Sequence, residues 1–513
     1  MVVSHGSLRA PPPAARGRCR RGRAVVAAAL ALVAGLAGSA RAQGADPFTD
    51  ALDGNSGLGT ASAPDDPTFG PLLTIEAIEI EGNDATSESV ILRALPLGGG
   101  EMLRAGDPRL QAARFKLLAL GFFRDVSLRL RRGSARGRVV LVVQVVERGT
   151  IVLNRLYFGT SSSSRWWFGA DVGERNFLGT GLALGGGFVR TGAGAIEGAD
   201  DQWAGEVRVA APSVGGRRFG LHAQATWIDA SEPYRVAGAA DADAAIDFRA
   251  FHYRRAGFRA GATYDLSTLA RLTVDGRAEW IDADLPEAPT RTLPDGGVVP
   301  VALHLEPGAS RVVTVGLGFD RDTRPDPVLP YAGDRLQLFG ELGGAMIGGS
   351  YDYATALARY QRWWPVRGPR HVVSMHLTAG LVLGEAPRFD RLHVADFNRL
   401  LTPRALGLVV ATTPSHDLLG TSSEEVNYGE VGGSAIVEYS YQLFRSRRRI
   451  YGGDLFIGAG LWALTSTDRV RARDTSLYRA LPVDLVVDAG LRIDTEIGIF
   501  ELTLANALGR VPL

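Results

Sequence analysis

The strict alternation of apolar and polar residues constrains the fold of this chain more than any other feature. From residue 373 to 383 every second residue is apolar, and the residues between them include Ser374, His376 and Thr378. Successive side chains of a β-strand point to opposite faces, so this segment is expected to be a strand with one apolar and one polar face. Residues 434–443 repeat the pattern.

Charged residues occupy the polar face of another such segment. Within residues 484–494, Asp488 and Arg492 alternate with apolar residues. A dry protein core penalises these charges, whereas a water-filled lumen accepts them. No apolar run after residue 38 is long enough to cross a membrane as a helix. The sequence therefore predicts a mainly β protein, with an antiparallel transmembrane β-barrel over residues 150–513.

The first 42 residues have the pattern of a signal peptide. A basic run precedes an apolar run, and the small residues Ala40 and Ala42 favour cleavage after them. The single cysteine, Cys19, lies in this segment, so the mature chain is expected to have no disulfide. Residues 43–71 are rich in Gly, Ser, Asp and Pro and are expected to form a flexible leader.

Residues 72–149 are expected to form a small α/β domain. The order is a strand, two helices and two strands, and the second helix begins at Asp107-Pro108 and ends near Gly121. Leu117 and Val126 are expected in its core. Of the neighbours Phe122 and Phe123, one is expected to pack on the helices and the other to be more exposed.

The segments "IEIEGN", "LLALGFFRDV" and "VVLVVQVVER" in this order resemble a POTRA domain. Such domains are the periplasmic modules of the BamA/TamA-type outer-membrane insertase and transporter family. The resemblance implies that the domain binds client strands by adding them to a sheet edge. The residues of that client-binding edge stay undefined at this point.

The rest of the chain resembles the barrel of the same family. "WWFGADVGERNFLGTG" is similar to its first hairpin, and "GLGFDRDTRPDPVLPYAGDRLQLFGEL" is similar to strands eight and nine with the turn between them. Asp322, Arg324 and Gly333 match the motif of that turn. "GGSAIVEYSYQLF", "LFIGAGLW" and "VVDAGLRIDTEIGIFELTLANAL" resemble strands twelve to fifteen.

A long loop, about residues 385–431, is expected to fold back into the lumen. It contains "RFDRLHVADFNRLLTPRALG", in which Arg404 matches by position the arginine at the tip of the family's sixth outer loop, and Gly407 comes one residue later than in the family. In the family this arginine pairs with acidic residues of strands twelve and thirteen. The matching positions here are not acidic, so Glu438 on the same inner face is expected to substitute. The alternative is that Arg404 is a solvated loop charge.

The strand count predicted from the sequence is fifteen to sixteen. Fifteen strands can be placed, the last at about residues 499–508, whereas the family has a sixteenth strand after this one. Bacterial single-chain barrels almost always have an even count. A truncated chain or a divergent barrel with a short seam is favoured over a strand overlooked within residues 241–259.

The expected function is assembly or insertion of outer-membrane proteins, in the cell outer membrane with the POTRA domain in the periplasm. Expected partners are outer-membrane lipid, unfolded outer-membrane or secreted client proteins, and periplasmic chaperones or accessory lipoproteins. A formal net charge of +1 gives no reason to expect nucleic acid. No catalytic residue, metal site or cofactor is expected: the adjacent Ser415, His416 and Asp417, for example, cannot converge as a triad. The alternatives are a secretion pore for one partner and a passive structural barrel.

Overall fold

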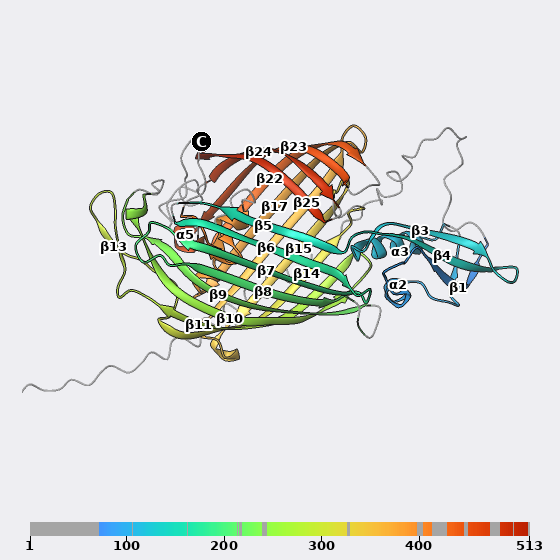
Figure 1. The fold of residues 1–513 in the computed structure, drawn as a ribbon, viewed down its shortest axis with the longest axis horizontal. Coiled ribbons are helices and arrows are strands. Elements are labelled where there is room, and N and C mark those ends of the chain that lie inside the picture. Colours follow the sequence, from blue (N-terminus) through green and yellow to red (C-terminus); the bar gives the residue numbers. More distant parts are fainter. Residues whose placement is uncertain are drawn as a thin grey trace, which may run out of the picture.

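The computed structural model describes residues 71–510 apart from 105, 162, 213, 215–217, 239–243, 326–328, 398–403, 413–427, 446–449, 472–482 and 496. The expected signal peptide and leader, and the Ser415 trio, lie outside the described residues. Figure 1 shows two parts: a small blue α/β domain on the right and a large sheet that curls into a barrel on the left.

The small domain consists of a four-stranded sheet covered by two helices. Its strands are β1 (Leu73–Glu81), β2 (Met102–Leu103), β3 (Phe123–Arg132) and β4 (Arg138–Glu147), in the order β2-β1-β4-β3, and its helices are α2 (Glu88–Ala94) and α3 (Pro108–Ala119). Helix α3 starts where the sequence predicts, because the Asp107 side chain accepts a hydrogen bond of 2.9 Å from the Arg109 amide.

Leu117 and Val126 lie in the core of this domain, as expected. The expectation that only one of Phe122 and Phe123 is buried was wrong, because both are at most 3% exposed. Strand β3 begins at Phe123, so Phe122 belongs to the preceding turn and does not follow the alternation of the strand. Both rings enter the core, with centroids 6.0 Å apart in an edge-to-face arrangement.

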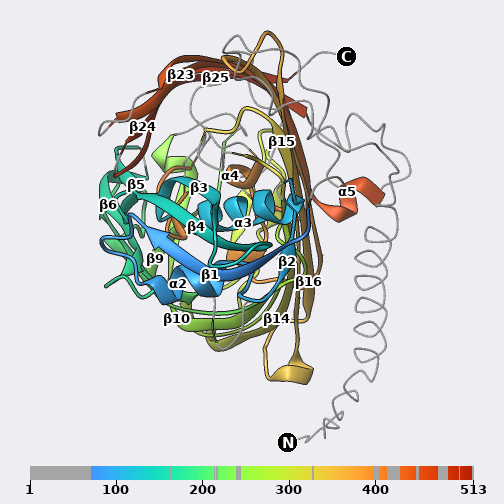
Figure 2. The same cartoon turned by 90° about the vertical axis from the view of Figure 1, so that its right-hand side faces the viewer.

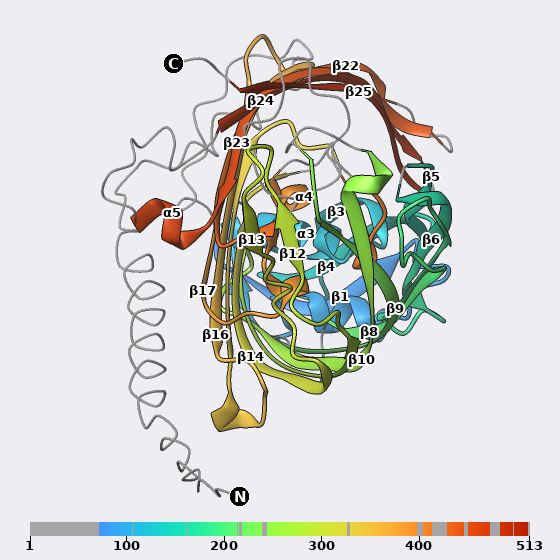
Figure 3. The ribbon, with the colours of Figure 1, turned by 90° about the vertical axis from the view of Figure 1, so that its left-hand side faces the viewer.

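The second sheet forms the barrel, and within the described residues it contains fifteen strands. These are β5 (Ile151–Gly159), β6 (Ser164–Phe177), β7 (Leu182–Ala193), β8 (Gln202–Ala211), β9 (Phe219–Arg235), β10 (Phe248–Asp265), β11 (Ala270–Asp284), β14 (Gly308–Asp322), β15 (Gly333–Gly343), β16 (Tyr353–Pro365), β17 (His371–Gly384), β22 (Val431–Arg445), β23 (Ile450–Thr465), β24 (Val483–Thr495) and β25 (Gly498–Arg510). Each is antiparallel to its neighbour in this order, and Figures 2 and 3 show the closed cross-section from the two ends.

The predicted fold class is confirmed, and so is the placement of fifteen strands within the described residues. The doubtful region 241–259 supplies a short 3-10 helix, η1 (Ala245–Asp247), and the first part of β10, so its described residues hold no additional strand. Because the sheet contains an odd number of strands and each is antiparallel to the next, its first and last strands, β5 and β25, run in the same direction. The edges of these two strands meet at a seam.

The outward face of the barrel is apolar and the inward face is charged. On β8, Val207 and Val209 point outward and are 54% and 37% exposed, whereas Glu206 and Arg208 point inward and form an ion pair. Such a large exposed apolar surface is stable only in contact with lipid. The inward charges line the lumen, and many of them are paired, for example Arg208 with Asp171.

The loops at the outer end contain further short elements. These are β12 (Thr290–Thr292), β13 (Val298–Pro300), η2 (Ala345–Ile347), η3 (Arg388–Asp390), β18 (Leu392–His393), α4 (Val394–Phe397), β19 (Arg404–Ala405), β20 (Leu408–Val409), β21 (Tyr428–Gly429) and α5 (Thr467–Arg471). Of the helices in the described part of the chain, none combines the length and the apolar character needed to cross a membrane.

The small domain sits against the end of the barrel that lies nearest to it, as Figure 2 shows from that side. The turn after β6 contacts the start of α2, where the Ser87 amide donates to the Gly179 carbonyl (3.0 Å) and the Asn176 side chain donates to the Thr86 hydroxyl (2.8 Å). On α3, Lys116 pairs with Asp265 at the end of β10 (3.4 Å). The domain is therefore attached to several strands of the barrel.

Candidate functional site

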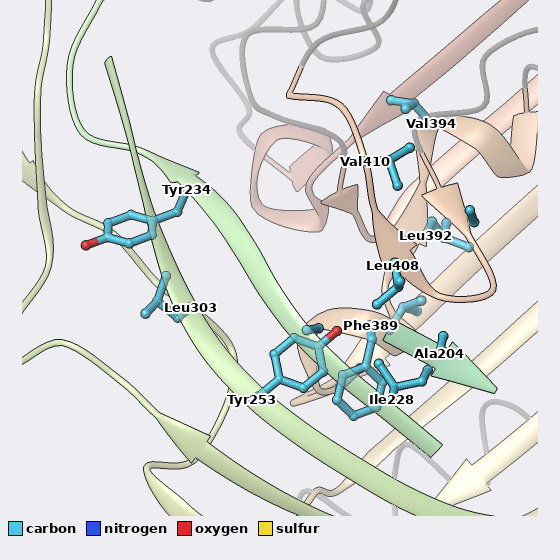
Figure 4. Packing of buried hydrophobic residues seen from close by; sticks show 14 of the residues in the cluster. Ala204, Ile228, Tyr234, Tyr253, Leu303, Phe389, Leu392, Val394, Leu408 and Val410 are labelled. Atoms are coloured by element: carbon cyan, nitrogen blue, oxygen red, sulfur yellow. The ribbon is translucent and has the colours of Figure 1, made fainter. Parts of the chain in front are cut away.

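The loop between β17 and β22 enters the lumen and packs on the inner wall. Its described parts are residues 385–397, 404–412 and 428–430. Figure 4 shows Phe389 and Leu408 from the loop next to Tyr253 and Ile228 from β10 and β9, and the rings of Phe389 and Tyr253 are 5.9 Å apart. These residues belong to the largest buried apolar cluster, which therefore lies between loop and wall.

Arg388 fixes the loop to strand β9. Its Nε atom donates to the Glu232 carboxylate and its Nη2 atom to the Pro233 carbonyl (3.2 Å), while the guanidinium lies 4.8 Å from the centre of the Tyr428 ring. The side chains of Arg388 and Glu232 are only 9% and 2% exposed. In a pair this deeply buried, the hydrogen bonds between the two groups offset the cost of removing both charges from water. The loss of either partner leaves an uncompensated buried charge.

Asp390 fixes the same loop to strands β11 and β16. Its two carboxylate oxygens each accept a hydrogen bond of 3.0 Å from Arg277, and the Tyr353 hydroxyl donates to one of them at 2.7 Å. Arg277 also binds Glu279 and Glu341, so it neutralises part of an acidic cluster on the wall. The segment 388–390 is thus attached to strands on both sides of the lumen.

Arg404 and Gly407 also lie in the loop, at its inner tip. The Nη2 atom of Arg404 donates to the Phe389 carbonyl (2.9 Å), so this arginine fixes one part of the loop to another. Gly407 has a φ angle of +86°, and a Cβ atom there would lie 2.9 Å from the side chain of Ile228. Only glycine combines this backbone conformation with such a close approach to the wall.

The expected pair of Arg404 and Glu438 is not formed in the described part of the chain. Glu438 instead accepts two hydrogen bonds from Arg492 on β24, at 2.5 and 2.7 Å, and Arg492 also binds Glu501. The loop tip packs on β8, β9 and β10, whereas Glu438 lies on β22 and already has a partner two strands away, so the two side chains do not meet. The alternative of a solvated Arg404 does not hold either, because its guanidinium hydrogen-bonds within the loop and lies 5.6 Å from the centre of the Tyr428 ring.

The turn between β14 and β15 brings together Asp322, Arg324 and Gly333. Arg324 donates to the Asp322 carboxylate through Nε (2.8 Å) and Nη2 (2.6 Å). Gly333 has a φ angle of +90°, and a Cβ atom there would lie 2.8 Å from the Thr323 carbonyl. The arrangement closes the turn that connects the two strands.

The seam between β5 and β25 is the second candidate site. Among the described residues it has one backbone hydrogen bond, from the Leu153 amide to the Ile497 carbonyl (2.7 Å). Next to this bond, at the end of the barrel that faces the small domain, Arg148 lies 3.6 Å from Asp494 of β24. A cavity of about 340 Å³ remains inside the lumen, beside Arg255, Arg259 and the loop tip.

Sequence reasoning missed Arg388, Asp390 and their partners on the wall. The one available signal was the spacing of charges in "RFDR", where an aromatic residue separates an arginine from an aspartate. The partners Glu232 and Arg277 lie more than 100 residues away in the sequence, and alternation alone gives no indication that they meet this loop.

Comparison with family models gives two matches. The Omp85 superfamily domain matches residues 176–396, and the POTRA model, described as a surface antigen variable number repeat, matches residues 73–148. A search of the curated proteins finds no match.

Comparison with solved structures gives matches of low sequence identity. BamA from Haemophilus ducreyi lacking POTRA domains 1–3 is 15% identical, with a TM-score of 0.47 over 86% of this chain and 82% of that one. CdiB from Escherichia coli is 12% identical, with a TM-score of 0.46 over 96% and 94%. CdiB from Acinetobacter baumannii is 10% identical, with a TM-score of 0.48 over 85% and 74%.

The family matches agree with the architecture: one α/β sheet domain is followed by an antiparallel barrel with a charged lumen and an apolar outer face. The chain therefore belongs to the Omp85 superfamily, as an outer-membrane β-barrel with one POTRA domain in the periplasm.

Proposed function

We propose that this protein assembles client β-strands into the outer membrane at the seam between β5 and β25. Omp85 barrels act in transport and assembly and are not enzymes, so the function concerns client proteins. We also propose the division expected from the sequence: a signal peptide over residues 1–42, a leader over 43–71, the POTRA domain over 72–149 and the barrel with its inward loop over 150–513.

The observation that carries this proposal is the weak seam. Strands β5 and β25 share one backbone hydrogen bond in the described residues, whereas every other neighbouring pair in the sheet forms a full antiparallel ladder. An unpaired backbone group in lipid costs several kcal/mol, so the two edges favour the addition of a strand.

The direction of the two edges supports the same conclusion. Strands β5 and β25 both run from the periplasmic end to the outer end, so they are parallel to each other. A single strand inserted between them in the opposite direction is antiparallel to both and completes an even number of strands. The POTRA domain, which contacts the periplasmic end of the barrel, is then well placed to deliver such a strand. Periplasmic chaperones or accessory lipoproteins are further partners in this proposal.

A disulfide across the seam tests the proposal. The Leu153 amide lies 2.7 Å from the Ile497 carbonyl, so the two backbones are close enough for a disulfide to be tried between these positions. The natural cysteine Cys19 lies in the expected signal peptide. We expect Leu153→Cys with Ile497→Cys to stop assembly of outer-membrane proteins when oxidised and to restore it when reduced. The matched control is Leu156→Cys with Ala170→Cys, which links the paired strands β5 and β6. Equal assembly with the seam locked would contradict the proposal.

A secretion pore for one partner is the second candidate, and the lumen favours it. A cavity of about 340 Å³ lies in the lumen beside the loop tip, and release of the loop would enlarge it. Depletion of the protein followed by proteomics of the outer membrane separates the two: loss of many barrel proteins supports assembly, and loss of one exported protein supports a pore. If the amounts of barrel proteins and of exported proteins both stay unchanged, the protein is a passive barrel.

A further inference from the structure

Two arginines, Arg148 and Arg175, lie at the periplasmic end of the seam, and one of them, Arg148, is paired with a carboxylate. Arg148 directly follows β4 and lies three residues before the start of β5. Its Nη2 atom is 3.6 Å from Oδ1 of Asp494 near the end of β24, and both side chains are 10% exposed. The ion pair therefore connects the two sides of the seam. The Arg148 Nε atom is buried and has no hydrogen-bond partner among the described residues.

Arg175 on β6 is the second arginine of this group. Its backbone amide donates to the Thr150 carbonyl at the foot of β5 (3.0 Å), and its guanidinium approaches Gly121 of the POTRA domain. The charges of Arg148 and Asp494 both act on it. In the described part of the chain no carboxylate forms an ion pair with Arg175.

The direction of an inserted strand determines what reaches this end of the seam. Strand β5 follows the periplasmic domain and runs outward, so a strand added antiparallel to its edge runs from the outer end toward the periplasm. The last residue of that strand arrives next to Arg148 and Arg175. When the strand is the C-terminal strand of a client, this residue carries the free α-carboxylate.

In the closed seam, the turn between β24 and β25 occupies this position. Its Ile497 carbonyl accepts the hydrogen bond of the Leu153 amide, and its Asp494 carboxylate lies beside Arg148. A client's last residue offers the same two groups, a backbone carbonyl for the β5 edge and a carboxylate for the arginines. Opening of the seam moves Asp494 away and leaves the two guanidinium groups available.

We propose that Arg148 and Arg175 form a binding site for the C-terminal carboxylate of a client strand, in which that carboxylate replaces Asp494. The site rests on the proposed assembly function and adds a specific requirement to it: clients must end near the periplasmic end of their last strand. Guanidinium groups bind carboxylates through two parallel hydrogen bonds, which suits the recognition of a chain terminus.

Two forms of one peptide test the site. The probe is a ten-residue peptide of alternating valine and threonine that ends in phenylalanine, with either a free carboxylate or a C-terminal amide. Binding to the full-length protein in detergent is measured by fluorescence anisotropy. Because hydrogen bonds to a charged group contribute about 1.5 kcal/mol or more, we expect the acid to bind roughly tenfold more tightly than the amide.

Substitution of Arg175 then identifies the site. Arg175→Gln is expected to bring the two affinities close together by weakening the acid form alone, and Arg175→Lys is expected to restore part of the difference. Arg190→Gln, at the outer end of β7, is the control and should keep the tenfold ratio. Unchanged affinity for the amide form in Arg175→Gln shows that the seam remains intact.

The other possible outcomes contradict either the carboxylate site alone or the assembly function as well. Equal binding of acid and amide to the natural protein, or an unchanged ratio in Arg175→Gln, would remove the carboxylate site but leave the assembly function standing. Displacement of the acid form by phosphatidylglycerol micelles, with the amide form unaffected, would assign the arginines to lipid phosphate instead. If neither peptide binds and a seam disulfide changes nothing, the proposed function itself fails.

Discussion

Loss of Arg388 should release the loop from the lumen. The Arg388 side chain is 9% exposed and that of its partner Glu232 is 2% exposed, so Arg388→Ala leaves a buried carboxylate without its counter-charge. Breaking a buried pair from one side costs about 3–5 kcal/mol. At the lower value the population of the released loop rises by about 150-fold.

A cysteine on the loop measures this change. Val410, a residue of the loop, is fully buried while the loop is docked, and its replacement by cysteine changes the side-chain volume little. In whole cells or detergent, the rate at which a maleimide labels Val410→Cys reports the fraction of released loop. We expect labelling to accelerate about 150-fold in Arg388→Ala and by a similar factor in Glu232→Gln.

The double variant distinguishes a specific pair from general damage. Removal of both charges by Arg388→Met with Glu232→Leu leaves no unpaired ion, and well-packed apolar replacements of buried pairs are often neutral. Its labelling rate should therefore fall well below that of either single variant. A rate equal to the product of the two single effects would show that the residues act independently and would refute the reasoning.

Three further predictions concern the POTRA domain and the loop. Leu117→Asp places a charge in the POTRA core and should unfold that domain, seen as rapid proteolysis, while the barrel stays in the membrane fraction; a missing barrel would mean that the two parts do not fold independently. Gly179→Ala brings a Cβ atom 2.1 Å from a POTRA carbonyl and should separate the domains in crosslinking, whereas Gly100→Ala, with a similar φ and open space, should not; equal effects would implicate backbone strain alone. Burial first, and then the nearby Arg391 and Arg388, lower the pKa of His304 to about 4. The docked state therefore binds fewer protons than the released one, whose pKa is about 6.5, and loop stability should fall from pH 6.5 toward 4. Labelling of Val410→Cys, corrected for free-thiol reactivity, should be faster at pH 5 than at pH 7.5, and His304→Gln should remove that difference.

Sequence patterns sufficed for the parts of the structure that are local. The alternation of residues 373–383 specifies both strand and orientation because the period of a strand is two, and β17 spans the whole segment. The turn with Asp322, Arg324 and Gly333 is similarly local, since its hydrogen bonds connect residues at most about a dozen positions apart.

The loop attachments were not accessible in this way. The pair of Arg388 and Glu232 joins residues 156 positions apart, and its formation depends on which wall of the barrel the loop leans against. The position of Arg404 in the motif correctly indicates that it lies at the loop tip, but its partner follows from packing in three dimensions. A charged residue at an inward-facing position predicts that the lumen contains water. It does not predict which residue forms the ion pair with that charge.

The contact between α3 and the end of β10 provides a native chemical reporter. Lys116 is the only lysine in the sequence, and it faces Asp265 with 15% of its side chain exposed. An amine-reactive ester can therefore acylate only this side chain and the α-amino group. Since the ammonium must leave Asp265 and lose its proton before it reacts, the extent of acylation during client addition would increase with the time that the POTRA domain spends away from the barrel in the unaltered protein.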